Sequence, residues 1–143
     1  MNITVSMEIA TVDELKRIGC CEEALAFCRQ LGSTSITVAD IERDDVPISY
    51  IVWMAEHVHP SRLHLMMNHS NWYVRVAVAG RIPEQYLTVM AKDTDYDVRA
   101  TVSNRIDVIF LNRMVNDESE DVRVVVARRI DDYYLSQMIM DRS

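Results

Sequence analysis

The chain has 143 residues, of which 49% are hydrophobic and 26% are charged, and its formal net charge is −7. This composition is typical of one ordered, helix-rich domain and excludes a disordered chain. The acidity lies in residues 1–60, whose net charge is −6, whereas residues 61–143 have a net charge of −1. Neither part has the surplus of positive charge that marks nucleic-acid-binding domains, so nucleic acid is disfavoured as a partner.

The sequence predicts a cytoplasmic protein that does not enter a membrane. No apolar stretch approaches the length of a transmembrane helix, and the first residues show no basic region followed by an apolar run. The cysteines are odd in number and close together, at Cys20, Cys21 and Cys28. Such a group favours reduced thiols over a framework of disulfides.

Residues 1–45 are predicted to form an N-terminal helical cap. The stretch 2–9 is either a short strand or an arm, and the sequence leaves this open. Thr11 to Glu14 (TVDE) has the spacing of a capping box, and Gly19 is placed to end the helix that follows. A second helix, CEEALAFCRQL, is expected to run to Gly32, and VADIER suggests a third.

The rest of the chain contains an internal repeat. The stretches NWYVRVAVAGRI, DYDVRATVSNRI and SEDVRVVVARRI begin at residues 71, 95 and 119, so they recur at a period of 24 residues. Val98, Val102 and Ile106 describe one face of a helix, and Leu111 with Met114 describes a second, shorter helix. Helix pairs this short must stack to bury their apolar faces. One repeat column holds methionines that are expected in the core: Met66, Met90, Met114 and Met138.

A divergent copy, SYIVWMAEHVHPSRLHLMM, precedes these three. It keeps Leu63 and Met66 in the leucine and methionine columns but has Tyr50 and Ile51 in place of the Val-Arg pair. The sequence therefore predicts an all-α fold with about four 24-residue helix pairs in a solenoid over residues 46–143.

The segment DTDYDVRATVSNRIDVIFLNRM resembles the leucine-rich repeat variant family, and it is also similar to a shortened HEAT repeat. The resemblance implies a right-handed superhelix in which an α-helix alternates with a shorter 3₁₀-type helix. Family members often have a proline after the first helix, which here is only Pro83, with Asp107 and Asp131 in its place. The N-terminal segment GCCEEALAFCRQLGS is weakly similar to small bacterial and phage proteins of unassigned function, which implies such an origin.

Arginines form two rows at the repeat period. The first row consists of Arg75, Arg99 and Arg123, and a role in stabilising the fold is favoured for it. Its members are expected to pair with aspartates that bridge neighbouring copies or cap helix starts: Asp93, Asp97, Asp117 and Asp121. The second row has fewer acidic neighbours in the sequence and is the better candidate for binding a partner. It comprises Arg81, Arg105 and Arg129, to which we add Arg128 and Arg62.

Histidines and cysteines raise the alternative of a metal or iron–sulfur protein. His57 and His64 are seven residues apart, and no histidine pair has the i, i+4 spacing of a helical metal site. Some leucine-rich repeat variant proteins carry an N-terminal iron–sulfur module, but a cluster needs four ligands, and this chain offers only three cysteines. A structural role is favoured instead. Cys21 and Cys28 are expected to be small buried residues, and no cofactor is expected.

The sequence thus favours a non-enzymatic module that binds another protein. A nucleic-acid-binding protein that uses the second arginine row, and a metal or iron–sulfur protein, are the two alternatives. Neither the identity of the partner nor the oligomeric state follows from the sequence.

Overall fold

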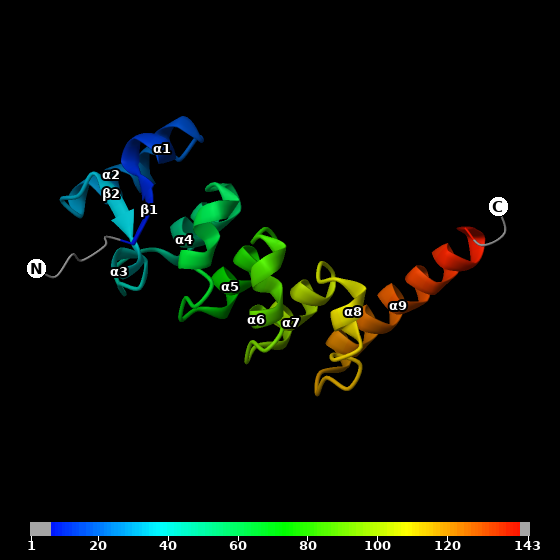
Figure 1. Cartoon of the computed structure of the whole chain (residues 1–143). Coiled ribbons are helices and arrows are strands. Elements are labelled where there is room, and N and C mark those ends of the chain that lie inside the picture. The colour runs from blue at the N-terminus through cyan, green and yellow to red at the C-terminus, as the bar shows by residue number, and fades with distance from the viewer. Residues whose placement is uncertain (1–6, 141–143) are drawn as a thin grey trace, which may run out of the picture. The chain divides into compact units, whose positions relative to one another are not determined.

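The computed structural model describes residues 7–140 and contains two compact units, Met1–Ile82 and Pro83–Ser143 (Figure 1). Most elements are helices, as the sequence predicts. Among the described residues, no helix is both long enough and apolar enough to span a bilayer. The right-handed sense, the count of four copies and a boundary at residue 45 remain predictions.

The first unit begins with a small sheet and three short helices. These elements are β1 (Glu8–Thr11), α1 (Val12–Arg17), α2 (Glu22–Gln30), β2 (Ser35–Thr37) and α3 (Val38–Ile41). The strands pair antiparallel, with Thr11 opposite Ser35. The expectation of an all-α fold is therefore wrong for this region. Its core includes Ile9 and Ile36, which lie on strands and not on helices. Of the stretch 2–9, residues 2–6 lie outside the described residues and Glu8 begins β1.

Local signals set the ends of these helices. The capping box of α1 is present, since the Thr11 side chain accepts from the Glu14 N–H and the Glu14 carboxylate accepts from the Thr11 N–H. A second capping box, from Thr37 to Asp40, starts α3. Gly19 and Gly32 follow α1 and α2 with φ of 90° and 72°, a backbone conformation that favours glycine. The predicted stops are confirmed.

The first unit continues with α4 (Ile48–His57), the 3₁₀ helix η1 (Pro60–Leu65) and α5 (Trp72–Ala79), and α4 packs against α5. Several contacts tie the N-terminal elements to these helices. Arg62 donates a hydrogen bond to the carbonyl of Glu8, and the buried His69 ring contacts the carbonyl of Ile41. The apolar core of α4, η1 and α5 contains Ile51, Ala55, Leu63, Val74 and Val78.

The second unit contains η2 (Glu84–Tyr86), α6 (Leu87–Met90), α7 (Tyr96–Ser103), α8 (Val108–Leu111) and α9 (Glu120–Met140). Residues 96–114 have the predicted form, a helix followed by a shorter one, and the residues of both apolar patterns are buried. These are Val98, Val102, Ile106, Leu111 and Met114. Val122 and Val126 of α9 complete the core of this unit, because α9 packs against α7 and α8.

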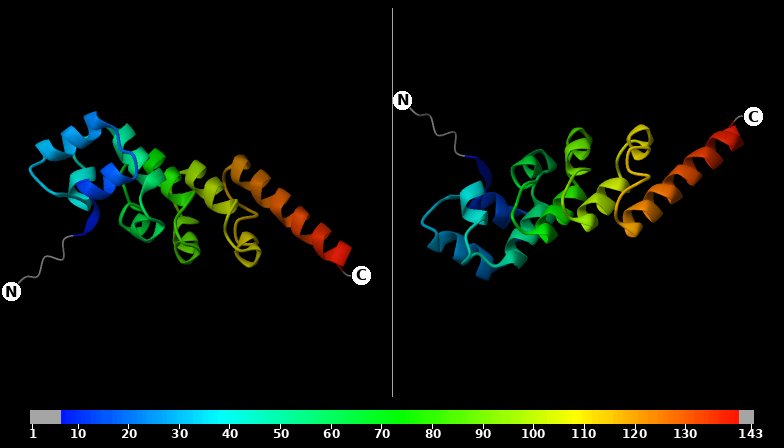
Figure 2. Two further views of the ribbon diagram at one scale, coloured as in Figure 1. Left: turned by 90° about the horizontal axis from the view of Figure 1, so that it is seen from above. Right: turned by 90° about the horizontal axis from the view of Figure 1, so that it is seen from below.

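The last copy does not form a helix pair. Helix α9 runs unbroken for 21 residues, and its final turns extend beyond the other elements of the second unit (Figure 2). Met138 is 59% exposed, so its assignment to the core is wrong. The physical reason lies in the column where α5 is followed by Gly80 and α7 by Asn104, both weak helix formers. This column holds Arg128 in the last copy, and arginine favours continuation of the helix.

Candidate protein-binding site

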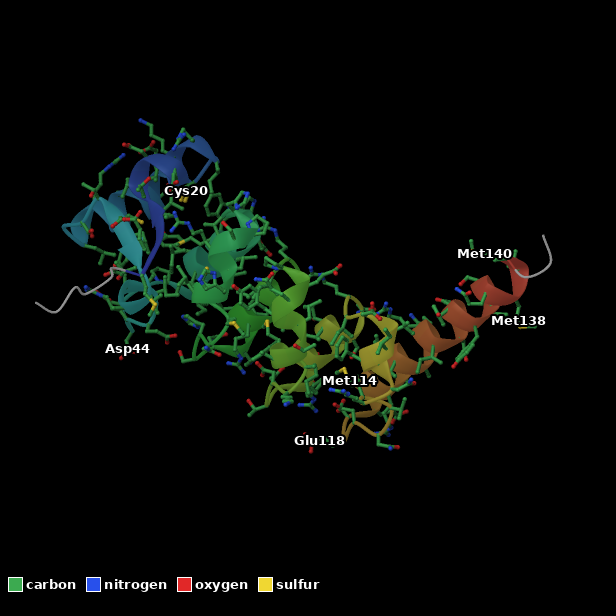
Figure 3. The ribbon with its side chains drawn as sticks, in the orientation of Figure 1. Cys20, Asp44, Met114, Glu118, Met138 and Met140 are labelled. Carbon is green, nitrogen blue, oxygen red and sulfur yellow. The ribbon has the colours of Figure 1, made fainter. Side chains whose placement is uncertain are left out.

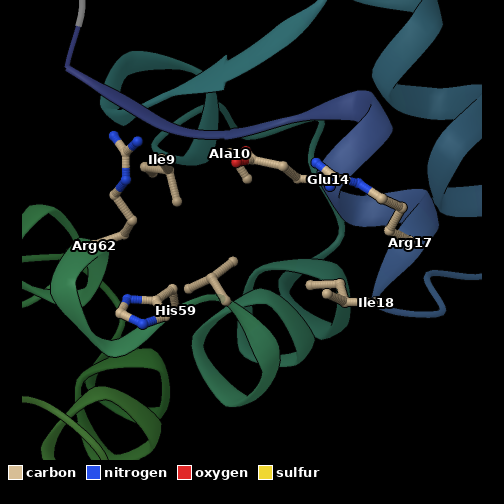
Figure 4. Close-up of a pocket in the computed structure, with 8 residues that line it drawn as sticks. Ile9, Ala10, Glu14, Arg17, Ile18, His59 and Arg62 are labelled. Carbon is tan, nitrogen blue, oxygen red and sulfur yellow. The ribbon is translucent and has the colours of Figure 1, made fainter.

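A pocket of about 270 Å³ lies in the first unit, between the N-terminal elements and η1. Figure 4 shows its walls: β1 supplies Ile9 and Ala10, α1 and the residue after it supply Glu14, Arg17 and Ile18, and His59 and Arg62 lie opposite. Val58 completes the lining. The buried side chains of Ile9, Ala10 and Val58 form the floor, and the charged side chains lie at the rim together with the exposed Ile18.

Two local structures hold the rim in place. The capping box fixes Glu14, whose carboxylate accepts from the Thr11 N–H at 2.8 Å. Arg62 lies on η1, which begins at Pro60, and its Nη1 donates to the Glu8 carbonyl at 3.0 Å. The guanidinium is thereby held against β1 at the edge of the pocket.

The rim has one anion and two cations. The hydrogen bond from the Thr11 backbone lowers the pKa of Glu14, and the charges of Arg62 and Arg17 lower this pKa further. Glu14 is therefore ionised at neutral pH, which leaves one surplus positive charge at the rim. An apolar floor beside a cationic rim is suited to an apolar side chain with a carboxylate next to it.

The sequence marks Arg62 as a candidate but gives no sign of the rest of the pocket. The contact between Arg62 and Glu8 joins residues 54 positions apart, and no local pattern predicts such a distance. The capping box marked Glu14, but only as a helix signal.

The first arginine row shares one structural role. Each guanidinium donates through Nη1 to the two carbonyls six and five residues earlier in the chain, and so fixes the loop before its own helix. The pairs are Arg75 with His69 and Ser70, Arg99 with Asp93 and Thr94, and Arg123 with Asp117 and Glu118.

Arg99 also makes a buried ion pair with Asp117. Nε and Nη2 of Arg99 lie 2.8 and 2.9 Å from the two carboxylate oxygens, a bidentate geometry, and Arg99 is only 6% exposed. The hydrogen bonds from Arg99 lower the pKa of Asp117, and the same bonds raise the pKa of Arg99. This pair connects α7 to the loop that precedes α9.

The second arginine row is a binding candidate because it has fewer acidic neighbours in the sequence, but two of its members have backbone partners in the structure. Arg81 donates to the carbonyls of Ala55 and Val58 at 2.8 and 3.0 Å. Arg129 donates to the carbonyls of Ser103 and Ile106, at the same offsets of 26 and 23 residues. Each guanidinium therefore donates to carbonyls at the C-terminal end of the first helix of the preceding repeat, which is α4 for Arg81 and α7 for Arg129. Arg105 also has an interaction partner.

The histidines make local contacts. The Nδ1 atoms of His57 and His64 lie 2.8 Å from the carbonyls of Trp53 and Ser61. The Nδ1 of His69 accepts from the Asn71 N–H, so its Nε2 carries the proton that is donated to Ile41. Across residues 7–140, no three His, Cys, Asp or Glu side chains are placed to hold a metal ion.

The cysteines differ in environment. Cys28 is buried on α2, as predicted, whereas Cys21 is exposed at the N-terminus of this helix, where the prediction of burial is wrong. Burial raises the pKa of both Cys20 and Cys28. These two thiols are therefore protonated at neutral pH, which disfavours them as nucleophiles.

Comparisons with known proteins support the fold. No model of a protein family matches the chain, and no curated protein does. A solved structure described as a leucine-rich repeat variant with a novel repetitive structural motif matches with a TM-score of 0.61 and 29% sequence identity. The match covers 92% of this chain and 55% of that one, so the chain spans about half the length of the protein it resembles. The chain thus has a helical repeat fold similar to that of a leucine-rich repeat variant.

Proposed function

We propose that this chain is a non-enzymatic protein-binding module, and that the pocket of the first unit receives a peptide segment with an apolar residue beside an acidic one. The carrying observation is the combination of a buried apolar floor, formed by Ile9, Ala10 and Val58, with Arg17, Arg62 and the exposed Ile18 at the rim. Helical repeats commonly serve as binding scaffolds, and the fold supports this role by analogy. The bacterial or phage origin stays a prediction, as do the solenoid form and the cytoplasmic location.

The size of the pocket favours a side chain over a cofactor. Pockets for small molecules usually measure about 300 to 1,000 Å³ and enclose most of the ligand. At about 270 Å³ this pocket lies below that range, and it suits one or two side chains of a docked peptide.

The test is selection of peptides from a random display library by the full chain. We expect the selected peptides to share an apolar residue next to Asp or Glu. Arg17→Glu and Arg62→Glu should each weaken their binding by at least about tenfold, because the rim then repels the acidic residue. Two variants are used because Arg62 also holds the Glu8 carbonyl.

Lys92→Glu provides the matched control, since it reverses an exposed charge that lies outside this pocket. It should leave peptide binding unchanged. The proposal is overturned if no peptide is enriched, or if the enriched peptides bind both rim variants as tightly as they bind the unmodified chain.

A further inference from the structure

One side of α9 carries an exposed stripe whose residues follow a 4,3,4,3 spacing along the helix. Because this spacing averages 3.5 residues, it keeps the side chains on one face and is typical of a helix that pairs with another helix. Val122 and Val126 point into the core of the unit, and the stripe lies on another side of the helix. The α9 stripe consists of Val124, Arg128, Asp131, Leu135 and Met138, all of them exposed.

The end of α9 exposes several large apolar side chains within two turns of helix. Residues 133–140, YYLSQMIM, contain no charged side chain, and every one of them is exposed. Figure 3 shows Met138 and Met140 on the final turns of the helix. A helix that is apolar around most of its circumference is normally covered by another element. A partner for this segment is therefore expected on physical grounds.

The fold-back that covers the preceding repeat is not available to this segment while α9 is straight. In the preceding repeat, the segment after α7 folds back toward it, so that the Met114 sulfur lies 3.5 Å from the Ser103 hydroxyl. The corresponding residues of the last copy are Ala127 and Met138, which stand on one continuous helix. Eleven residues of α-helix span roughly 16 Å, so these two side chains cannot meet.

We propose that the α9 stripe is the contact surface between two copies of this chain, which pair through antiparallel α9 helices about a twofold axis. In the register where Arg128 of each copy faces Asp131 of the other, Val124 of each also faces Leu135 of the other. These four residues are thus complementary to themselves in both charge and apolarity, whereas Met138 of each chain lies opposite Asp121 of the other, at the edge of the contact. This self-complementarity is what a twofold interface requires, and it is the reason for choosing a second copy as the occupant.

This surface goes beyond the proposed peptide pocket, because it uses other residues in the other unit. It also gives a role to Arg128, which was added to the candidates although it lies outside both arginine columns. Arg128 keeps the helix continuous, and it supplies the cation that fixes the register of the pair.

The experiment measures self-association of the full chain by analytical ultracentrifugation up to about 1 mM, the range needed for a weak pair. We expect a reversible dimer. Arg128→Asp and Asp131→Arg should each raise the dissociation constant at least about tenfold, because each places like charges opposite one another.

Mixing the two variants gives the sharpest result. At these two positions the Arg128→Asp chain has only carboxylates and the Asp131→Arg chain has only guanidiniums, so every facing pair in the heterodimer joins opposite charges. A 1:1 mixture should therefore dimerise although neither variant does so alone. An effect confined to one chain, such as an i, i+3 pair on its own helix, cannot produce this rescue. Lys92→Asp is the control and should dimerise normally.

Three results would overturn the proposal. The first is a chain that stays monomeric throughout the concentration range. The second is a dimer that neither charge reversal weakens, and the third is a mixture that fails to associate when both single variants have lost their dimer.

Discussion

Residues 96–114 and 120–138 have the same repeat pattern but different structures. In the first stretch α7 ends at Ser103 and is followed by the separate helix α8, which packs against α9, and Leu111 is fully buried. In the second stretch α9 continues, and the equivalent Leu135 is 58% exposed. The apolar pattern is the same in both, so it does not decide between a helix pair and a single helix. The two stretches differ at the residue after the first eight helical positions, which is Asn104 in one and Arg128 in the other, and arginine is the better helix former.

The largest expected effect breaks the stretch that forms a helix pair. Val102 is fully buried on α7, where a carboxylate would have no partner. Val102→Asp should destabilise the chain by more than about 5 kcal/mol, enough to unfold the second unit. Circular dichroism during urea unfolding measures this. Val124→Asp changes a residue that is half exposed, and the variant should remain folded; a Val102→Asp variant with normal stability would refute the inward orientation of Val102.

The buried ion pair gives the next largest effect. Asp117→Ala removes the bidentate partner of the buried Arg99 guanidinium, which then keeps only the exposed Glu118 carboxylate at 3.2 Å, and should cost about 3 kcal/mol. The comparison is with Asp131→Ala, which removes an exposed carboxylate from α9 and should cost less than about 0.5 kcal/mol. Equal losses in the two variants would show that the pair contributes nothing beyond an ordinary surface charge.

The same pair predicts a dependence on pH. Because the folded-state pKa of Asp117 is lowered by Arg99, the unfolded chain binds more protons between the folded and unfolded pKa values. The contribution of the pair is therefore complete above the unfolded value of about 3.9 and is lost as the pH falls through the folded value. Urea unfolding between pH 3 and 6 should show a decline at the acid end that is smaller in Asp117→Asn.

The sequence predicts the fold well wherever adjacent residues determine it. Val98 and Val102 are buried as their spacing predicts, and the Thr11 capping box forms. The unbroken α9 was not predicted. The prediction of a last helix pair rested on Asp131 standing where the first copy has Pro83, and it left out that Arg128 stands where that copy has Gly80. The strand pair was missed for another reason, since two strands of three or four residues give too few alternations for a pattern.

The candidate site was harder to predict than the fold. Sequence can show that the guanidiniums of Arg81 and Arg129 recur at the repeat period, but it cannot show backbone carbonyls as their acceptors. Every residue has a backbone carbonyl, and those in the last turn of a helix lack a partner within the helix. The sequence alone does not show where these carbonyls lie. The pocket was missed for a similar reason, because β1 and η1 meet only in three dimensions.

An intermediate effect sharpens the comparison between the two stretches directly. Leu111→Ala should cost about 3 kcal/mol, since it leaves a cavity in the core of the second unit. Leu135→Ala changes the equivalent residue of α9 and should cost less than about 0.5 kcal/mol in dilute solution. Thermal unfolding of both variants at low concentration measures the difference. A large loss in Leu135→Ala would show that α9 breaks near Asp131 and that its end folds back.

The smallest expected effect concerns the arginines that serve as helix caps. Arg129→Ala removes the donor for the carbonyls of Ser103 and Ile106 and should cost about 1 to 2 kcal/mol, the penalty for partly buried acceptors that lose their hydrogen bonds. Arg81→Ala should cost a similar amount, because its guanidinium contacts the equivalent carbonyls in the first unit. Arg129→Lys should recover only part of the loss, since an ammonium lacks the planar fork of a guanidinium. Urea unfolding compares these three variants with Lys92→Ala. If all of them behave like Lys92→Ala, the second row has no structural role, and its arginines become candidates for binding a partner once more.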